Sequence, residues 1–150
     1  MWPKADNIEY RRDAALAAHF AASSVSCRRL TAAEHRDREF AWRQVYQRTF
    51  ASEGNFRHGT KAVDAYLRES ATRWQFVPFL SGVPGTAVHV IRPEVSAFEC
   101  EGPLLELGDF LNVEFFISPP DLSWTFVRTH EDFALGGPYF ARHASTAPST

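Results

Sequence analysis

Apolar positions follow a helical period through the first half of the chain. A first helix is predicted over residues 6–22. A second is predicted to begin at Thr31, because Thr31 and Glu34 have the spacing of a capping box, in which each side chain accepts a hydrogen bond from the other residue's backbone amide. The apolar face of this second helix is predicted to contain Phe40, Trp42, Val45, Tyr46 and Phe50. A third helix is expected to start with Thr60 as its N-cap and to end near Thr72.

From Trp74 onward the pattern changes to strands, several of which alternate between apolar and polar residues. A turn rich in glycine and proline, at residues 81–85, joins the first two segments. The predicted strands cover residues 74–80, 86–91, 97–101, 109–117 and 123–129. The fold class is therefore α+β, with N-terminal helices packed on a C-terminal, mostly antiparallel four- to five-stranded sheet.

The composition is that of an ordinary folded domain. The chain has 150 residues, of which 45% are hydrophobic and 23% charged, and this excludes a disordered or collagen-like chain. We expect a single α+β domain over residues 1–143 and a flexible tail over residues 144–150. The N-terminus lacks the apolar stretch of a signal peptide, and prolines and glycines interrupt the longest charge-free run. A cytoplasmic protein without a membrane segment is predicted.

The two cysteines, Cys27 and Cys100, lie far apart and form no C-x-x-C pair. A disulfide scaffold and a zinc ribbon are therefore not expected. The simplest interpretation is a pair of buried, inert thiols in a reducing compartment. Neither a metal nor a cofactor is predicted for the chain.

Charge is distributed unevenly along the chain. Residues 1–75 hold 13 Lys and Arg against 9 Asp and Glu, a net charge of +4, whereas the second half has a net charge of −6. The arginines of the second predicted helix alternate with Glu34, Asp37 and Glu39, which indicates a solvated helix face rather than a nucleic-acid-binding surface. The acidic second half favours a basic partner protein.

Three carboxylates are predicted to share one face of the sheet. If Phe98, Cys100 and Leu111 point inward, strand alternation turns Glu99, Glu101 and Glu114 to the opposite face. Such a cluster can steer a basic partner protein, or it can share acid–base or metal chemistry with a nearby histidine. It can also be an ordinary solvent-facing surface.

A second candidate site follows the last predicted strand. The apolar strand that contains Trp124 leads into a polar cluster of His130, Glu131 and Asp132, and a glycine-containing turn then leads to Tyr139. His130 beside Glu131 fits a pH-sensitive ligand or a general base, and Trp124 and Tyr139 offer wide contact surfaces. Alternatively, His130 bonds a backbone carbonyl while Tyr139 holds the tail on the core.

The same segment carries a family resemblance. Residues 124–131 read W-T-F-V-R-T-H-E, and residues 137–140 read G-P-Y-F. This string is similar to the C-terminal signature, W-T-x-V-x-T-H-E followed by G-P-Y-F, of a family of small, functionally uncharacterised bacterial proteins. The resemblance implies a compact bacterial domain and brings no activity with it.

Three functional hypotheses follow from these patterns. The first is a non-enzymatic protein-binding domain, of which an immunity or antitoxin-type protein is the sharpest form, with an acidic surface that receives a basic protein. The predicted partner-binding residues are Glu99, Glu101, Glu114, Trp124, His130, Glu131, Asp132 and Tyr139. The second is a small hydrolase or metal-assisted enzyme that uses His130, Glu131 and the sheet carboxylates. The third is a homo-oligomer that hides a phenylalanine-rich face between copies.

Overall fold

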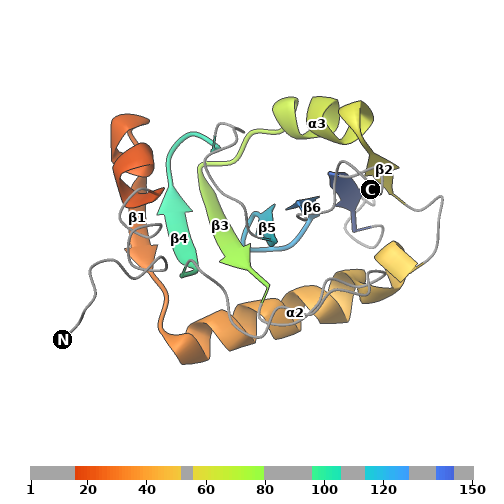
Figure 1. Ribbon diagram of the computed structural model, residues 1–150, viewed down its shortest axis with the longest axis horizontal. Coiled ribbons are helices and arrows are strands. Elements are labelled where there is room, and N and C mark those ends of the chain that lie inside the picture. The colour runs from red at the N-terminus through yellow and green to blue at the C-terminus, as the bar shows by residue number, and fades with distance from the viewer. Residues whose placement is uncertain (1–15, 52–55, 80–95, 106–113, 129–137, 144–150) are drawn as a thin grey trace.

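The computed structural model describes residues 16–51, 56–79, 96–105, 114–128 and 138–143 (Figure 1). Within these ranges, residues 16–22 are helical, followed by helices α2 (Ala32–Ala51) and α3 (Thr60–Leu67). The strands are β1 (Ser26–Arg29), β2 (Arg57–His58), β3 (Arg73–Pro78), β4 (Phe98–Glu101), β5 (Phe115–Ser118), β6 (Trp124–Arg128) and β7 (Tyr139–Arg142). None of the described helices is long and apolar enough to span a membrane.

The seven strands form one sheet in the order β1-β4-β3-β5-β6-β7-β2, and every neighbouring pair is antiparallel. This confirms the α+β class and corrects the predicted number of four to five strands. Three strands were not predicted, namely β1, β2 and β7, whereas the strand predicted at residues 86–91 lies outside the described residues. Strands β1 and β2 come from the half of the chain that was predicted to be helical. All residues of both strands are exposed and they lie at the two sheet edges, so no alternation between apolar and polar positions marks them.

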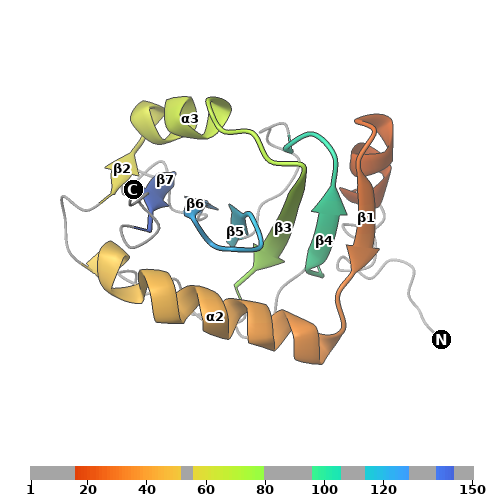
Figure 2. The ribbon, with the colours of Figure 1, turned by 180° about the vertical axis from the view of Figure 1, so that it is seen from behind.

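Helices cover both faces of the sheet. Figures 1 and 2 show α2 on one side of the strands and α3 on the other. On the α3 side, Phe20 of the N-terminal helical segment packs edge-to-face on Trp74 and Phe98, with ring centroids 5.7 and 5.6 Å apart. Tyr66 of α3 contacts Phe126 at 4.7 Å. These aromatic contacts form one of two hydrophobic cores.

The second core lies between α2 and the opposite sheet face. Trp42 and Tyr46 are fully buried there, and the Trp42 ring stacks on Phe116 with centroids 5.1 Å apart. Phe40, which was predicted to share this face, is instead 65% exposed. The residues of α2 that turn toward the sheet are His35, Glu39, Trp42 and Tyr46, so polar side chains occupy the first half of the buried stripe.

The helix termini test the capping predictions. The Glu34 amide donates to Thr31 Oγ1 at 3.1 Å, and Glu34 Oε1 accepts from the Thr31 amide at 2.8 Å, so the predicted capping box is confirmed. The N-cap of α3 is Gly59 rather than Thr60, and the helix ends at Leu67, short of Thr72. Gly59 has a φ of 66°, which glycine adopts without the steric cost that other residues meet.

Candidate functional site: an arginine-lined cavity

The three predicted sheet carboxylates do not form an exposed acidic surface. Glu99 accepts a 2.7 Å hydrogen bond from Arg28 and lies 3.7 Å from Arg38 of α2, and its bond with Arg28 holds its pKa below the usual range. Glu114 is only 3% exposed, and Glu101 is the one member of the three that is fully at the surface. The prediction of a shared acidic surface was wrong because α2 covers the sheet face on which Glu99 lies.

The two aromatic residues of the second predicted site differ in burial. Trp124 is 3% exposed and stacks on Phe140 with centroids 5.8 Å apart, so it is a core residue and cannot contact a partner. Tyr139 is half-buried against Phe56 at 5.4 Å. His130, Glu131 and Asp132 lie outside the described residues. The structure therefore does not test the role predicted for that polar cluster.

Buried polar groups gather between α2 and the sheet. They are His35, Glu39, Gln75, Glu114, Ser118 and Thr125. Two of them connect α2 with the sheet, since His35 Nε2 lies 2.6 Å from the Pro78 carbonyl oxygen and Trp42 Nε1 donates to Thr125 Oγ1 at 2.9 Å. Among the described residues, no group of three His, Cys, Asp or Glu side chains is placed to hold a metal ion. We interpret this layer as structural, because its polar contacts fix α2 on the sheet.

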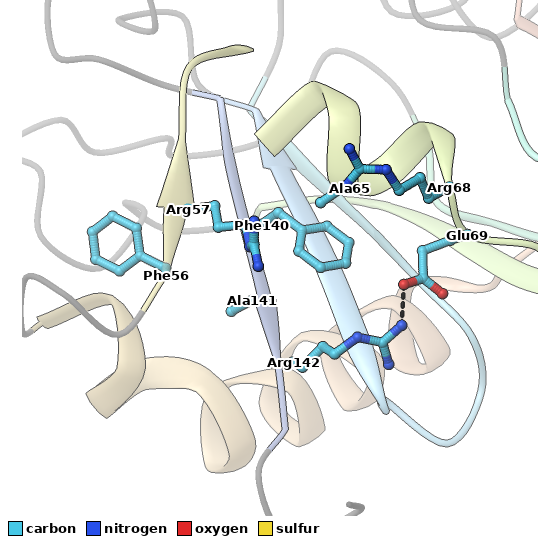
Figure 3. Close-up of a pocket in the computed structure, with 8 residues that line it drawn as sticks. All are labelled: Phe56, Arg57, Ala65, Arg68, Glu69, Phe140, Ala141 and Arg142. Atoms are coloured by element: carbon cyan, nitrogen blue, oxygen red, sulfur yellow. Dashed lines mark hydrogen bonds and ion pairs between the residues drawn. The ribbon is translucent and has the colours of Figure 1, made fainter. Parts of the chain in front are cut away.

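An open cavity of about 560 Å³ lies on the other side of the sheet, where α3 meets the edge formed by β2 and β7 (Figure 3). Its lining comprises Phe56, Arg57, Ala65, Arg68, Glu69, Phe140, Ala141 and Arg142. These residues come from three segments, of which the last is far from the other two in the sequence. The antiparallel pairing of Arg57 with Phe140 brings the first and last of them together.

Three arginines and one glutamate give this lining a net positive charge. Arg142 forms an ion pair with Glu69, drawn as a dashed line in Figure 3. Within the part of the chain that the structure describes, Arg57 and Arg68 have no ion-pair partner. Two guanidinium groups are thus available at an open cavity, where each can donate paired hydrogen bonds to a carboxylate or phosphate.

The surrounding packing holds the cavity walls in place. The Gly59 amide donates to the Pro138 carbonyl oxygen at 2.9 Å, which ties the start of α3 to the start of β7. Phe140, which lines the cavity, is only 4% exposed and stacks on Trp124 with ring centroids 5.8 Å apart. The arginines are therefore presented by a strand edge and a helix end whose positions are fixed by tertiary contacts.

Sequence reasoning did not identify this site. Arg57, Arg68 and Arg142 belong to no motif, and their proximity depends on the β2–β7 pairing of two segments that are far apart in the sequence. The net charge of +4 in residues 1–75 was the only related signal, and it includes Arg57 and Arg68.

Comparisons with known proteins returned no match, since no family model, curated protein or solved structure matches the chain. The resemblance of the C-terminal segment to a bacterial family therefore stays a prediction.

Proposed function

We propose that this chain is a non-enzymatic binding protein whose arginine-lined cavity receives an acidic segment of a partner protein. The observation that carries the proposal is the presence of Arg57 and Arg68 at an open cavity without a countercharge from any described residue. Bidentate pairing of a guanidinium with a carboxylate gives both affinity and orientation. The proposal keeps the protein-binding function predicted from the sequence and reverses the charge of the partner.

The surroundings of the cavity favour a protein ligand. Leu67, the last residue of α3, is an apolar side chain that is 67% exposed, although it does not line the cavity itself. Phe56 also lines the cavity, and its half-buried ring packs against Tyr139. Arginine and aromatic residues are enriched in protein interfaces and carry much of their binding energy. A segment that combines glutamates with aliphatic side chains has the matching chemistry.

The cavity does not bear on the other functional predictions. The enzymatic alternative depends on His130 and Glu131, which are outside the described residues, and it stays a prediction. A cytoplasmic location and a homo-oligomeric state also stay predictions.

Fluorescence anisotropy with a labelled peptide of alternating glutamate and leucine tests the proposal. We expect the wild-type protein to bind it, with an affinity that falls as salt rises. The Arg57→Gln/Arg68→Gln variant should bind at least about tenfold more weakly, which corresponds to about 1.4 kcal/mol. The matched control is Arg36→Gln/Arg48→Gln, which removes the same charge from two exposed positions of α2 on the other side of the sheet.

Two outcomes would contradict the proposal. Equal losses in both double variants would show that net charge, rather than the cavity, attracts the peptide. Binding of inorganic phosphate or citrate at the cavity without binding of the peptide would identify a small-anion site instead.

A further inference from the structure

Strands β1 and β4 place the two cysteines of the chain directly opposite each other. Cys27 and Cys100 are partners in the antiparallel register, between the pairs Ser26–Glu101 and Arg28–Glu99. Residues opposite each other in such a ladder point to the same side of the sheet, with Cα atoms about 4.5–5.5 Å apart. A disulfide requires a Cα separation of about 4.4–6.8 Å, so the backbone already has the spacing of a cross-strand bridge.

The two strands are held in this register from both ends. At one end, Leu30 donates its amide to the Ala97 carbonyl oxygen at 2.8 Å. At the other end, the chain after β4 passes closely by the chain before β1, where a Cβ on Gly102 would meet the Ser24 carbonyl oxygen at 2.9 Å. Gly102 has a φ of 133°, which disfavours any other residue there. Because the register is fixed, bridging the cysteines requires little movement of the backbone.

The two thiols differ in their access to solvent. Both are free in this structure, Cys27 at the exposed sheet edge and Cys100 in the core beside Trp74, its partner on β3. This corrects the prediction that both thiols are buried. Cys27 is therefore accessible to a small oxidant, whereas Cys100 is only 2% exposed and lies opposite Cys27.

We propose that Cys27 and Cys100 form a reversible intramolecular disulfide when the protein meets a low-molecular-weight disulfide. The Cys27 thiolate attacks one sulfur of the oxidant, and a mixed disulfide forms as the first small thiolate leaves. Cys100 then gives up its proton and attacks the Cys27 sulfur, which releases the second small thiolate. Two protein thiols are oxidised, one disulfide is reduced, and the two protein protons end on the two released thiols.

The bridge would attach an edge strand to the rest of the sheet covalently. All four residues of β1 are exposed, and the strand pairs within the described chain only with β4. It also carries Arg28, which links Glu34 of α2 with Glu99 of β4. Oxidation would therefore stabilise the β1 edge, and because the loop that it closes is long, it would also restrict the unfolded chain.

Equilibration of the purified protein with reduced and oxidised glutathione at several ratios tests the proposal. We expect intact mass to show the loss of two hydrogen atoms, and peptide mapping after alkylation to show a Cys27–Cys100 link. The urea midpoint of unfolding should be higher for the oxidised protein than for the reduced protein. In the Cys27→Ser variant, which changes an exposed position, the same oxidant should leave the midpoint unchanged.

Other products would overturn the proposal. A stable glutathione adduct on Cys27 with Cys100 still reduced would show that the second step does not occur. Disulfide-linked dimers through Cys27 would show that the exposed thiol reacts between molecules. Either result is read from the wild-type protein, so the test does not depend on whether a Cys100 variant folds.

Discussion

Replacement of Trp42 tests whether α2 is fixed to the sheet by the contacts described above. The indole is fully buried, stacks on Phe116 at 5.1 Å and meets Phe79 edge-on at 5.0 Å. Its Nε1 also donates to Thr125 Oγ1 at 2.9 Å. Trp42→Ala removes all of these contacts and leaves a cavity, which for a buried aromatic side chain lowers the free energy of unfolding by about 3–5 kcal/mol.

A second variant separates packing from hydrogen bonding. Trp42→Phe keeps an aromatic ring but removes the donor to the buried Thr125 hydroxyl, and loss of a buried donor lowers the free energy of unfolding by about 1–3 kcal/mol. The matched control is Phe40→Ala on the same helix, because Phe40 is 65% exposed and its removal should change stability by less than about 0.5 kcal/mol.

Urea unfolding followed by circular dichroism measures all three variants against the wild type. Trp42→Ala should destabilise the protein most, Trp42→Phe less and Phe40→Ala least. The slope of the unfolding free energy against urea concentration should be the same for all of them. Equal effects of Trp42→Ala and Phe40→Ala would refute the assignment of the buried face of α2.

Two further predictions concern polar contacts elsewhere. Tyr66→Phe should lower the free energy of unfolding by about 1–3 kcal/mol in the same assay, because the buried Leu105 carbonyl oxygen loses its 2.6 Å bond from the Tyr66 hydroxyl; an unchanged value would contradict this bond. Hydrogen bonds from Arg28 and from the Thr31 amide lower the pKa of Glu34 from 4.5 to about 2. A carboxyl whose pKa is lower in the folded state stabilises the fold above its unfolded pKa, so this contribution should disappear as the pH falls from about 4.5 to 2. Unfolding measured across that range should show a steeper loss of stability for wild type than for Glu34→Gln, and parallel curves would count against the assignment.

Features with a local cause could be predicted from the sequence. The capping box at Thr31 and Glu34 involves neighbouring residues only, and the structure contains it. The strand predicted at residues 97–101 corresponds to β4, and the strand at residues 123–129 corresponds to β6. In β4, Phe98 and Cys100 point into the core as their alternation indicated.

Features that depend on tertiary contacts could not be predicted in this way. Alternation correctly separated Phe98 from Glu99, yet it contains no information about which element covers the second face of the sheet. The buried stripe of α2 begins with His35 and Glu39, and a search for apolar spacing passes over both. Phe40, one position from Glu39, is rotated by about 100° from that stripe and so faces solvent.

The cavity was missed for a related reason. The proximity of Arg57 and Arg142 is a result of strand pairing between β2 and β7, and β2 has only two residues, both exposed. A strand so short has no hydrophobic period, so no sequence pattern could have placed Arg57 beside the last strand.

The two polar regions of the fold differ in what their charges contact. Under α2, burial removes water from Glu39, and the 2.9 Å ion pair with Arg43 compensates part of the cost of that desolvation. In the cavity, Arg57 and Arg68 are exposed, so water solvates them and the fold does not depend on neutralising them. A carboxylate brought by a ligand can therefore displace that water without breaking a contact that the fold requires. The difference indicates a structural role for the layer under α2 and supports the binding role proposed for the cavity.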